Sequence, residues 1–340
     1  MDVATFAAKP ESYDRLSLAQ ISTFFSSNTS ATREQCDKLA AELLRGPVSA
    51  TAIQGGSSYT VQRPQAGKVV QFRAAELDLI NLRLIEQVYK KFVPRGLYHG
   101  RLGLLHVYIW DWVPGPAFCR VRREMFTVDA KKRLGQTVED FARSVFTLYV
   151  LYSLVPNGVT RFFASAWINR PAVEAPSGLQ TEYEAKLDTL ILEMPNSLHS
   201  TINEVKQNLS LIFRPGFPMV VQHDDLLENN VHVDEATGHL TGVVDWANAK
   251  VAPYGISLGG LEIVLGIQTS TEWHFHPSHV RLRQQFWDTF DSEIGAISVL
   301  DRRSIEVARL MGLLRTHGIE WKNDMSGVYL EKLLLMPSTA

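Results

Sequence analysis

The spacing of hydrophobic residues changes at residues 111–116, where the sequence DWVPGP interrupts every regular pattern. Before this break the chain carries short runs typical of strands, and beyond it hydrophobic residues recur mainly three or four apart, as in helices. We therefore predict an α+β chain in three parts. These are a helical segment over 1–49, a small antiparallel sheet lobe over 50–112, and a larger, mostly helical lobe over 113–340.

The expected elements follow from these patterns. Strands are predicted at 50–53, 59–63, 68–73, 96–99 and 104–110, and the first three form a meander whose first turn is rich in glycine and serine. Helices are predicted at 15–25, 32–46, 75–92, 138–152, 198–213, 257–267, 279–293 and 301–316. One β interruption in the helical lobe, residues 217–246, reads as a strand, a polar loop and a hairpin.

Composition excludes several classes of protein. With 45% hydrophobic residues the chain can bury a sizeable core, and its formal net charge of −2 gives no attraction for nucleic acid or an anionic membrane. Its two cysteines, Cys36 and Cys119, are too few for a disulfide framework or a cysteine zinc cluster. The longest apolar run, 145–155, is too short to cross a bilayer, and the N-terminus lacks a signal-peptide pattern. We expect a cytoplasmic protein with no nucleic-acid or membrane partner; the sequence does not indicate its oligomeric state.

The predicted hairpin brings polar side chains together. Its arms are residues 231–233 and 240–244, so folding one onto the other places Asn230 and Asp245 at the same open end, with the strands about 4.8 Å apart. An amide oxygen and a carboxylate are hard donors of the kind that Mg²⁺ accepts beside water and phosphate oxygens. Asp225 comes five residues before Asn230, and a segment of that length spans at most about 17 Å. The sequence therefore predicts that all three side chains reach one site.

These three residues suit phosphoryl transfer. That reaction requires the phosphates to be held, their charge to be neutralised, and the attacking hydroxyl to be oriented, which an aspartate does by accepting its proton. Asp225, Asn230 and Asp245 can supply the last two functions. The alternative is a polar turn in which the same side chains cap backbone groups. The returning hairpin, together with the glycine turn upstream, favours the functional interpretation.

The motif His223-x-Asp225-x-x-x-x-Asn230, followed by Val244-Asp245-Trp246, resembles the HGDxxxxN and IDW signatures of the aminoglycoside phosphotransferase family. The resemblance covers roughly residues 50–320 and is similar in style to fungal members. It implies a bilobal protein-kinase-like fold. It also implies an enzyme that uses ATP and Mg²⁺ to phosphorylate a hydroxyl group of a small molecule.

The resemblance also implies individual roles. Asp225 is expected to be the catalytic base, His223 to support its loop, and Asn230 and Asp245 to bind Mg²⁺. ATP contacts are expected from Gly55, Gly56, Ser57 and Ser58 over the phosphates, from Arg73, and from a hinge at 109–111 that includes Trp110 and Asp111 and reads adenine through its backbone. Glycines suit the phosphate loop because missing Cβ atoms let backbone N–H groups approach phosphate oxygens. The acceptor pocket is expected in the helical lobe, near residues 158–176.

Three positions depart from the family pattern. Where lysine is usual on the third strand, the chain offers Arg73 or Lys68. The following helix has no glutamate securely at the expected position, near Asn81. Asp224 replaces a glycine, and its charge is expected to raise the pKa of a neighbouring carboxyl unless a metal ion neutralises both. An alternative function therefore stays open: a kinase-fold protein that only binds a nucleotide or metabolite, or that catalyses a different reaction in the same cleft.

Two further groups of residues are interpreted as structural. The spacing of His274, His276 and His279 fits neither one helix face nor a hairpin pair, so we predict a surface loop rather than a metal site. Trp110 and Trp112 are expected to pack between the lobes rather than to form a stacking platform.

Overall fold

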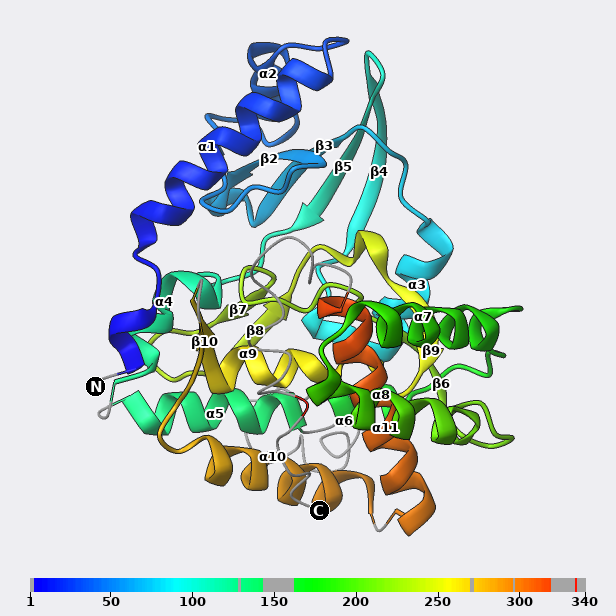
Figure 1. Ribbon diagram of the computed structural model, residues 1–340. Helices are drawn as coiled ribbons and strands as arrows, with labels where there is room; N and C mark the ends of the chain where they lie inside the picture. Colours follow the sequence, from blue (N-terminus) through cyan, green and yellow to red (C-terminus); the bar gives the residue numbers. More distant parts are fainter. Residues whose placement is uncertain are drawn as a thin grey trace, which may run out of the picture.

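The computed structural model describes residues 3–127, 130–142, 162–269, 272–295, 297–318 and 334. In this part of the chain an antiparallel sheet with two covering helices stands over a larger body of helices (Figure 1). This is the bilobal α+β fold that was predicted. Most of the helix predicted at 138–152 and the apolar run at 145–155 lie outside the described residues.

The smaller lobe is built on five antiparallel strands in the order β1-β2-β3-β5-β4. Their bounds are β1 (Ser49–Ala50), β2 (Ser58–Arg63), β3 (Lys68–Arg73), β4 (Gly96–Leu102) and β5 (Leu105–Asp111). The 3-10 helix η2 (Pro64–Ala66) joins β2 to β3 and ends at Gly67, whose φ of 62° is one that glycine adopts without strain. The predicted meander and the two later strands are therefore confirmed, except that the first strand, predicted at 50–53, is limited to Ser49–Ala50.

Helices α1 (Pro10–Ser27) and α2 (Arg33–Leu43) cover one face of this sheet (Figure 1). Both contribute to the hydrophobic cluster of the small lobe, where Phe24 packs with Tyr59 and Phe72 of the strands. Helix α2 begins with a capping box, in which Thr32 Oγ1 accepts from the Gln35 N–H and Gln35 Oε1 accepts from the Thr32 N–H. Both helices lie close to their predicted ranges.

Helix α3 (Leu79–Tyr89) continues into the 3-10 helix η3 (Lys90–Phe92), and its buried residues belong to the hydrophobic cluster of the helical lobe. The helix predicted at 75–92 begins four residues late, because the Asp78 side chain accepts from the N–H groups of Ile80 and Asn81 and caps it there. The Tyr89 hydroxyl donates to the carbonyl of Val221 at 2.8 Å. This bond ties α3 to the strand that precedes the polar loop.

The larger lobe is mainly helical. Its helices are α4 (Phe118–Met125), α5 (Lys131–Ala142), α6 (Phe163–Ile168), α7 (Leu179–Glu193), α8 (Asn196–Asn208), η6 (Leu209–Ile212), η8 (Ile256–Leu261), α9 (Glu262–Leu265), α10 (His279–Ile294) and α11 (Val299–His317), joined by η1 (Val3–Phe6) from the N-terminus. Helices α4, α6 and α7 were not predicted. The helix predicted at 257–267 is wrong at its end, where β10 (Gly266–Gln268) pairs with β11 (Trp273–Phe275). In the described residues, no helix is both long and apolar enough to cross a membrane.

The β interruption in this lobe forms two short ladders. Strand β6 (Met219–Gln222) pairs with β9 (Lys250–Pro253), and β7 (Val231–Val233) pairs with β8 (Leu240–Val243), followed by the 3-10 helix η7 (Trp246–Asn248). The hairpin tip is anchored on α5, where the buried Asp140 carboxylate accepts from the Leu240 N–H and contacts His239 Nδ1, both at 2.9 Å. The predicted strand, loop and hairpin are confirmed, and they place the polar loop at the boundary between the lobes.

Candidate active site

The three residues predicted to share a site do lie together. Asn230 Nδ2 donates to the backbone carbonyl of Asp225 at 2.8 Å and contacts Asp225 Oδ2 at 3.4 Å. The Val244 N–H donates to the Asn230 carbonyl at 2.9 Å, so the folded-back hairpin brings Asp245 beside them. Asp245 is in the left-handed conformation (φ 60°, ψ 56°), which is uncommon outside glycine and is frequent at functional sites.

His223 joins the two halves of this site. Its Nδ1 accepts from the Asp225 N–H at 3.2 Å, so Nε2 must carry the proton that is donated to the Val244 carbonyl at 2.8 Å. Burial lowers the pKa of His223, which keeps the ring neutral in this arrangement. The ring also packs edge-on against Trp246. The side chain predicted to support the loop therefore holds the turn at Asp225 against the residue that precedes Asp245.

The adjacent carboxylates Asp224 and Asp225 have different surroundings. Asp224 is held by both Nη atoms of Arg315 and, at 3.0 Å, by Lys250 Nζ. Burial alone would raise its pKa, but these two cations outweigh burial and hold the pKa below its usual value. Burial raises the pKa of Asp225, and the negative charges of Asp245 and, to a lesser extent, Asp224 add to this shift, whereas the hydrogen bond from Asn230 opposes it. The expected repulsion from Asp224 is thus a minor contribution.

Arg73, rather than Lys68, faces the site. Arg73 lies at the C-terminal end of β3, where Nη1 is 3.6 Å from Asp245 Oδ1 and Nη2 donates to Ser57 Oγ at 3.3 Å. Its side chain is only 7% exposed, and its Nε has no hydrogen-bond partner among the described residues. Lys68, at the other end of the strand, pairs with Asp111 on the surface. In the part of the chain that the structure describes, the ion pair of Arg73 is with Asp245 and none joins it to α3.

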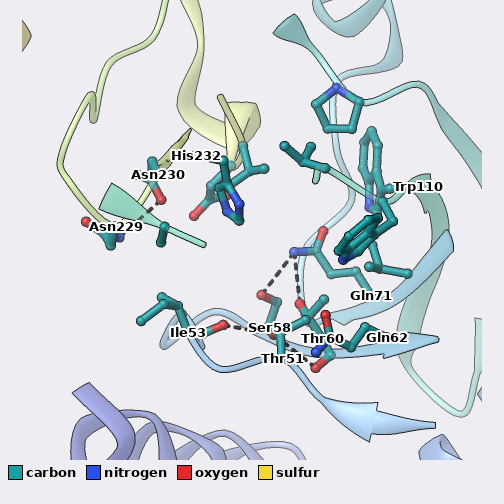
Figure 2. Close-up of a pocket in the computed structure, with 18 of the residues that line it drawn as sticks. Thr51, Ile53, Ser58, Thr60, Gln62, Gln71, Trp110, Asn229, Asn230 and His232 are labelled. Atoms are coloured by element: carbon teal, nitrogen blue, oxygen red, sulfur yellow. Dashed lines mark hydrogen bonds between the residues drawn. The ribbon is translucent and has the colours of Figure 1, made fainter. Parts of the chain in front are cut away.

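A cleft of about 400 Å³ lies between the sheet and the hairpin. Figure 2 shows Thr51, Ser58, Thr60 and Gln71 of the sheet lobe facing Asn230 and His232 across it. Arg73 and Asp245 also line the cleft, as do Gln54 and Gly55 of the glycine turn. A Cβ atom at Gly56 would meet nothing within 4 Å, so the backbone of this turn faces open space. The cleft has a size typical of small-molecule sites.

The predicted hinge lies within the sheet. Ile109 and Trp110 of β5 pair with β3 on one side and β4 on the other, and the Asp111 N–H donates to the Arg95 carbonyl. These pairings occupy backbone groups that were expected to read adenine. Trp110 and Asp111 do line the cleft, and residues 112–117 that follow them line it as well, except for Pro114. The Trp110 indole also stacks on Tyr108 of the same strand.

The donor set at the base of the cleft suits a divalent cation bound through phosphate. Asn230 and Asp245 offer one amide oxygen and one carboxylate, the hard ligands that Mg²⁺ combines with phosphate and water oxygens. No group of three or more His, Cys, Asp or Glu side chains among the described residues is arranged to hold a metal ion by itself. The histidines at 274, 276 and 279 form no such group, but the surface loop predicted for them is wrong. His274 lies in β11 and stacks on Phe6, His276 is buried, and His279 begins α10 and stacks on Phe275.

A family model described as the phosphotransferase enzyme family (APH) matches residues 51–261, which include the glycine turn, the polar loop and the hairpin. The chain belongs to this family. The resemblance predicted from the two motifs is thereby confirmed, and the family supports small-molecule phosphoryl transfer in general. A search of curated protein sequences returns no match.

Two solved structures have a fold similar to that of this chain. Aminoglycoside 2'-phosphotransferase-IIIa in its GDP complex is 13% identical with a TM-score of 0.50, and the alignment covers 94% of this chain and 97% of that chain. A choline/ethanolamine kinase family protein from Mesorhizobium loti is also 13% identical with a TM-score of 0.50, covering 89% of this chain and 95% of that one. At this identity the similarity shows the bilobal fold.

Several residues of the candidate site were not predicted. Arg315 and Lys250, which hold Asp224, are 91 and 26 residues away from it, and nothing in their local sequence points to that contact. Gln54, which directly precedes the two glycines of the turn, is buried and bonded to the next strand. Phe162 and Phe163, expected near the acceptor pocket, are instead buried in the core. Arg161, predicted with them, lies outside the described residues.

Proposed function

We propose that this protein is a phosphotransferase that transfers the γ-phosphoryl group of ATP, with Mg²⁺, to a hydroxyl group of a small molecule. The observation that carries the proposal is the contact of Asp225 with Asn230, which lines the cleft together with Asp245 and with Gly55 of the glycine turn. Family membership supports the same class of reaction. The solved neighbour bound to GDP supports nucleotide binding in this cleft and makes GTP the second donor to test.

Asp225 would act as the general base. As the acceptor oxygen forms its bond to the γ-phosphorus and the bond to the β-phosphate oxygen breaks, the hydroxyl proton passes to the Asp225 carboxylate and the nucleoside diphosphate leaves. The raised pKa of Asp225 strengthens it as a proton acceptor. Asn230 holds the Asp225 turn through the bond to its carbonyl, and His223 fixes the same turn from the buried side.

The remaining residues would bind the nucleotide. Asn230 and Asp245 would hold Mg²⁺, which when bound neutralises charge on the phosphates. Arg73 would contact the phosphates, because a guanidinium grips phosphate oxygens as a fork and its buried Nε has no partner among the described residues. The N–H groups of residues 55–58 would face the phosphates from above, as a glycine-rich turn permits. Trp110 and Asp111 would border the base.

Nucleotide turnover tests the proposal. The protein is incubated with Mg-ATP or Mg-GTP and pooled hydroxyl compounds, and diphosphate release and new phosphate esters are followed by ³¹P NMR. We expect turnover that Asp225→Ala abolishes, whereas Asp188→Asn, which alters an exposed carboxylate on α7, leaves it unchanged. Full turnover by Asp225→Ala would remove the base assignment, and a wild-type protein that binds neither nucleotide would remove the proposal.

The alternative is a kinase-fold protein without phosphoryl transfer. It is favoured by one observation: Arg73 contacts the proposed metal ligand Asp245 directly instead of a glutamate of α3. Thermal unfolding separates the two functions. Nucleotide at one hundred times its dissociation constant stabilises a binding protein by about 2.7 kcal/mol. Stabilisation without turnover supports this alternative, and stabilisation with turnover supports the transferase.

A further inference from the structure

Helix α1 contacts both sides of the cleft, although it lies outside the segment that the family model matches. Figure 1 shows it running from the sheet lobe down to α4 of the helical lobe. Asp14 Oδ1 accepts from Arg120 Nη1 of α4 at 2.6 Å. Ser17 Oγ donates to the Ala52 carbonyl at 2.9 Å and accepts from the Gln54 N–H at 3.1 Å. Ala52, Gln54 and Arg120 all line the cleft.

The two contacts are mechanically linked. Asp14 and Ser17 are three residues apart, so they lie on the same face of α1, separated by about 4.5 Å along its axis. A serine inside a helix usually bonds a carbonyl of its own preceding turn. Ser17 is buried and directs its hydroxyl to the sheet lobe instead. One rigid helical turn therefore connects the segment before the glycine turn to the helical lobe.

Gln54 carries this contact into the glycine turn. Its side chain is buried, with Oε1 accepting from the Thr60 N–H at 3.0 Å and Nε2 donating to the Thr60 carbonyl at 2.7 Å. The same Nε2 donates to Thr51 Oγ1 at 2.7 Å. The amide thus pairs with both backbone groups of Thr60 across the turn, as a neighbouring strand would. Because the Gln54 N–H is fixed by Ser17, the position of residues 55–58 depends on α1.

The N-terminal segment is also anchored in both hydrophobic cores. Ala4 and Ala7 belong to the cluster of the helical lobe, and Phe6 stacks on His274 with ring centroids 3.5 Å apart. Ile21 and Phe24, farther along, belong to the cluster of the sheet lobe. Movement of one lobe against the other must therefore strain or detach this segment.

We propose that α1 is a strap between the lobes, and that Ser17 is a positioning residue which holds the glycine turn for the phosphates of the nucleotide. The proposal rests on the proposed function for its ligand. Asp14 contributes less, because its ion pair with Arg120 is half exposed on the aspartate side and such pairs stabilise weakly. The Ser17 hydroxyl, buried and with two backbone partners, carries most of the connection.

The test compares Ser17→Ala with Ser26→Ala, whose exposed hydroxyl bonds only within the same helix. Amide hydrogen exchange is measured on the protein without nucleotide. We expect exchange in residues 51–58 to become about tenfold faster in Ser17→Ala, the effect of losing about one buried hydrogen bond, and to be unchanged in Ser26→Ala. Equal exchange in the wild type and Ser17→Ala, or equal changes in both variants, would overturn the strap.

Kinetics provides the second measurement. Ser17→Ala is expected to raise the KM for nucleotide about five- to tenfold while kcat and the KM for the acceptor stay within about twofold. An equal loss in kcat, or no change in the KM for nucleotide, would contradict positioning of the phosphate turn. If the wild type binds no nucleotide, the proposed function fails, whereas the exchange measurement still decides whether the strap exists.

Discussion

The two faces of the polar loop, one at Asp224 and the other at Asp225, show how neighbouring identical residues acquire different roles. Asp224 faces α11 and β9, where Arg315 and Lys250 neutralise it. Asp225 instead contacts the amide of Asn230 and feels the charge of Asp245, and these two residues line the cleft. The pKa of the first carboxyl is lowered and that of the second is raised. The comparison shows that the groups around each carboxylate set its role: two cations make Asp224 structural, whereas Asp225, which pairs with no cation in the described part of the chain, can accept a proton.

The largest expected effect is on kcat, when the carboxylate of Asp225 is replaced by an amide. Asp225→Asn removes a proton acceptor and is expected to lower kcat about a thousandfold, within the range of general-base catalysis. The same change should leave the free energy of unfolding equal or higher, since it relieves burial of a charge. Asp224→Asn should do the opposite, losing stability while retaining most of kcat. Steady-state kinetics and urea unfolding of both variants check this crossover, and equal kcat losses in the two would contradict it.

Removing the guanidinium of Arg315 should lower stability, because it pairs with Asp224. Arg315→Met leaves Asp224 with only Lys250, and breaking one side of this partly buried pair is expected to cost about 2 kcal/mol, less than for a fully buried pair. Arg303→Met, on the same helix, breaks an exposed pair with Glu204 and should cost about 0.5 kcal/mol or less. Chemical unfolding at pH 7 measures both. Similar losses of unfolding free energy in the two variants would show that the Asp224 pair stabilises the fold no more than an exposed pair does.

The pH dependence of stability gives a finer separation. Because the folded-state pKa of Asp224 lies below its unfolded value, near 3.8, its pairing contributes stability that is complete above that value. This stability is lost as the pH falls through the folded-state pKa. Asp224→Asn should therefore show a shallower loss of unfolding free energy between about pH 5 and 2 than the wild type. A parallel loss in both proteins would mean that Asp224 gains nothing from its partners.

The smallest effect is expected at Arg73. Arg73→Lys keeps the charge but removes the fork that contacts Ser57 and Asp245 together, so the KM for nucleotide should rise about three- to tenfold with a smaller change in kcat. Lys68→Met, at the exposed end of the same strand, is the matched control and should leave both parameters unchanged. If Lys68→Met raised the KM for nucleotide more than Arg73→Lys does, Lys68 rather than Arg73 would be the residue that contacts the phosphates.

The sequence predicted what depends on local pattern. Alternating residues predicted the sheet, and the apolar arms of the hairpin predicted that Asn230 and Asp245 meet. The cap of α3 by Asp78 shortened the predicted helix, because a side-chain bond outweighed hydrophobic spacing. The partners of Asp224 could not be predicted, since they come from distant elements. The contacts of Ser17 could not be predicted for the same reason, because its partners are 35 and 37 residues away.

The most direct measurement is the calorimetric titration of ATP into the protein with and without Mg²⁺. If Asn230 and Asp245 hold a metal ion that bridges to the phosphates, Mg²⁺ should tighten ATP binding at least about tenfold, and Asp245→Asn should abolish that gain while leaving metal-free binding unchanged. Equal affinity with and without Mg²⁺ in the wild type, or a full Mg²⁺ effect in Asp245→Asn, would contradict a shared metal and nucleotide site at the base of the cleft.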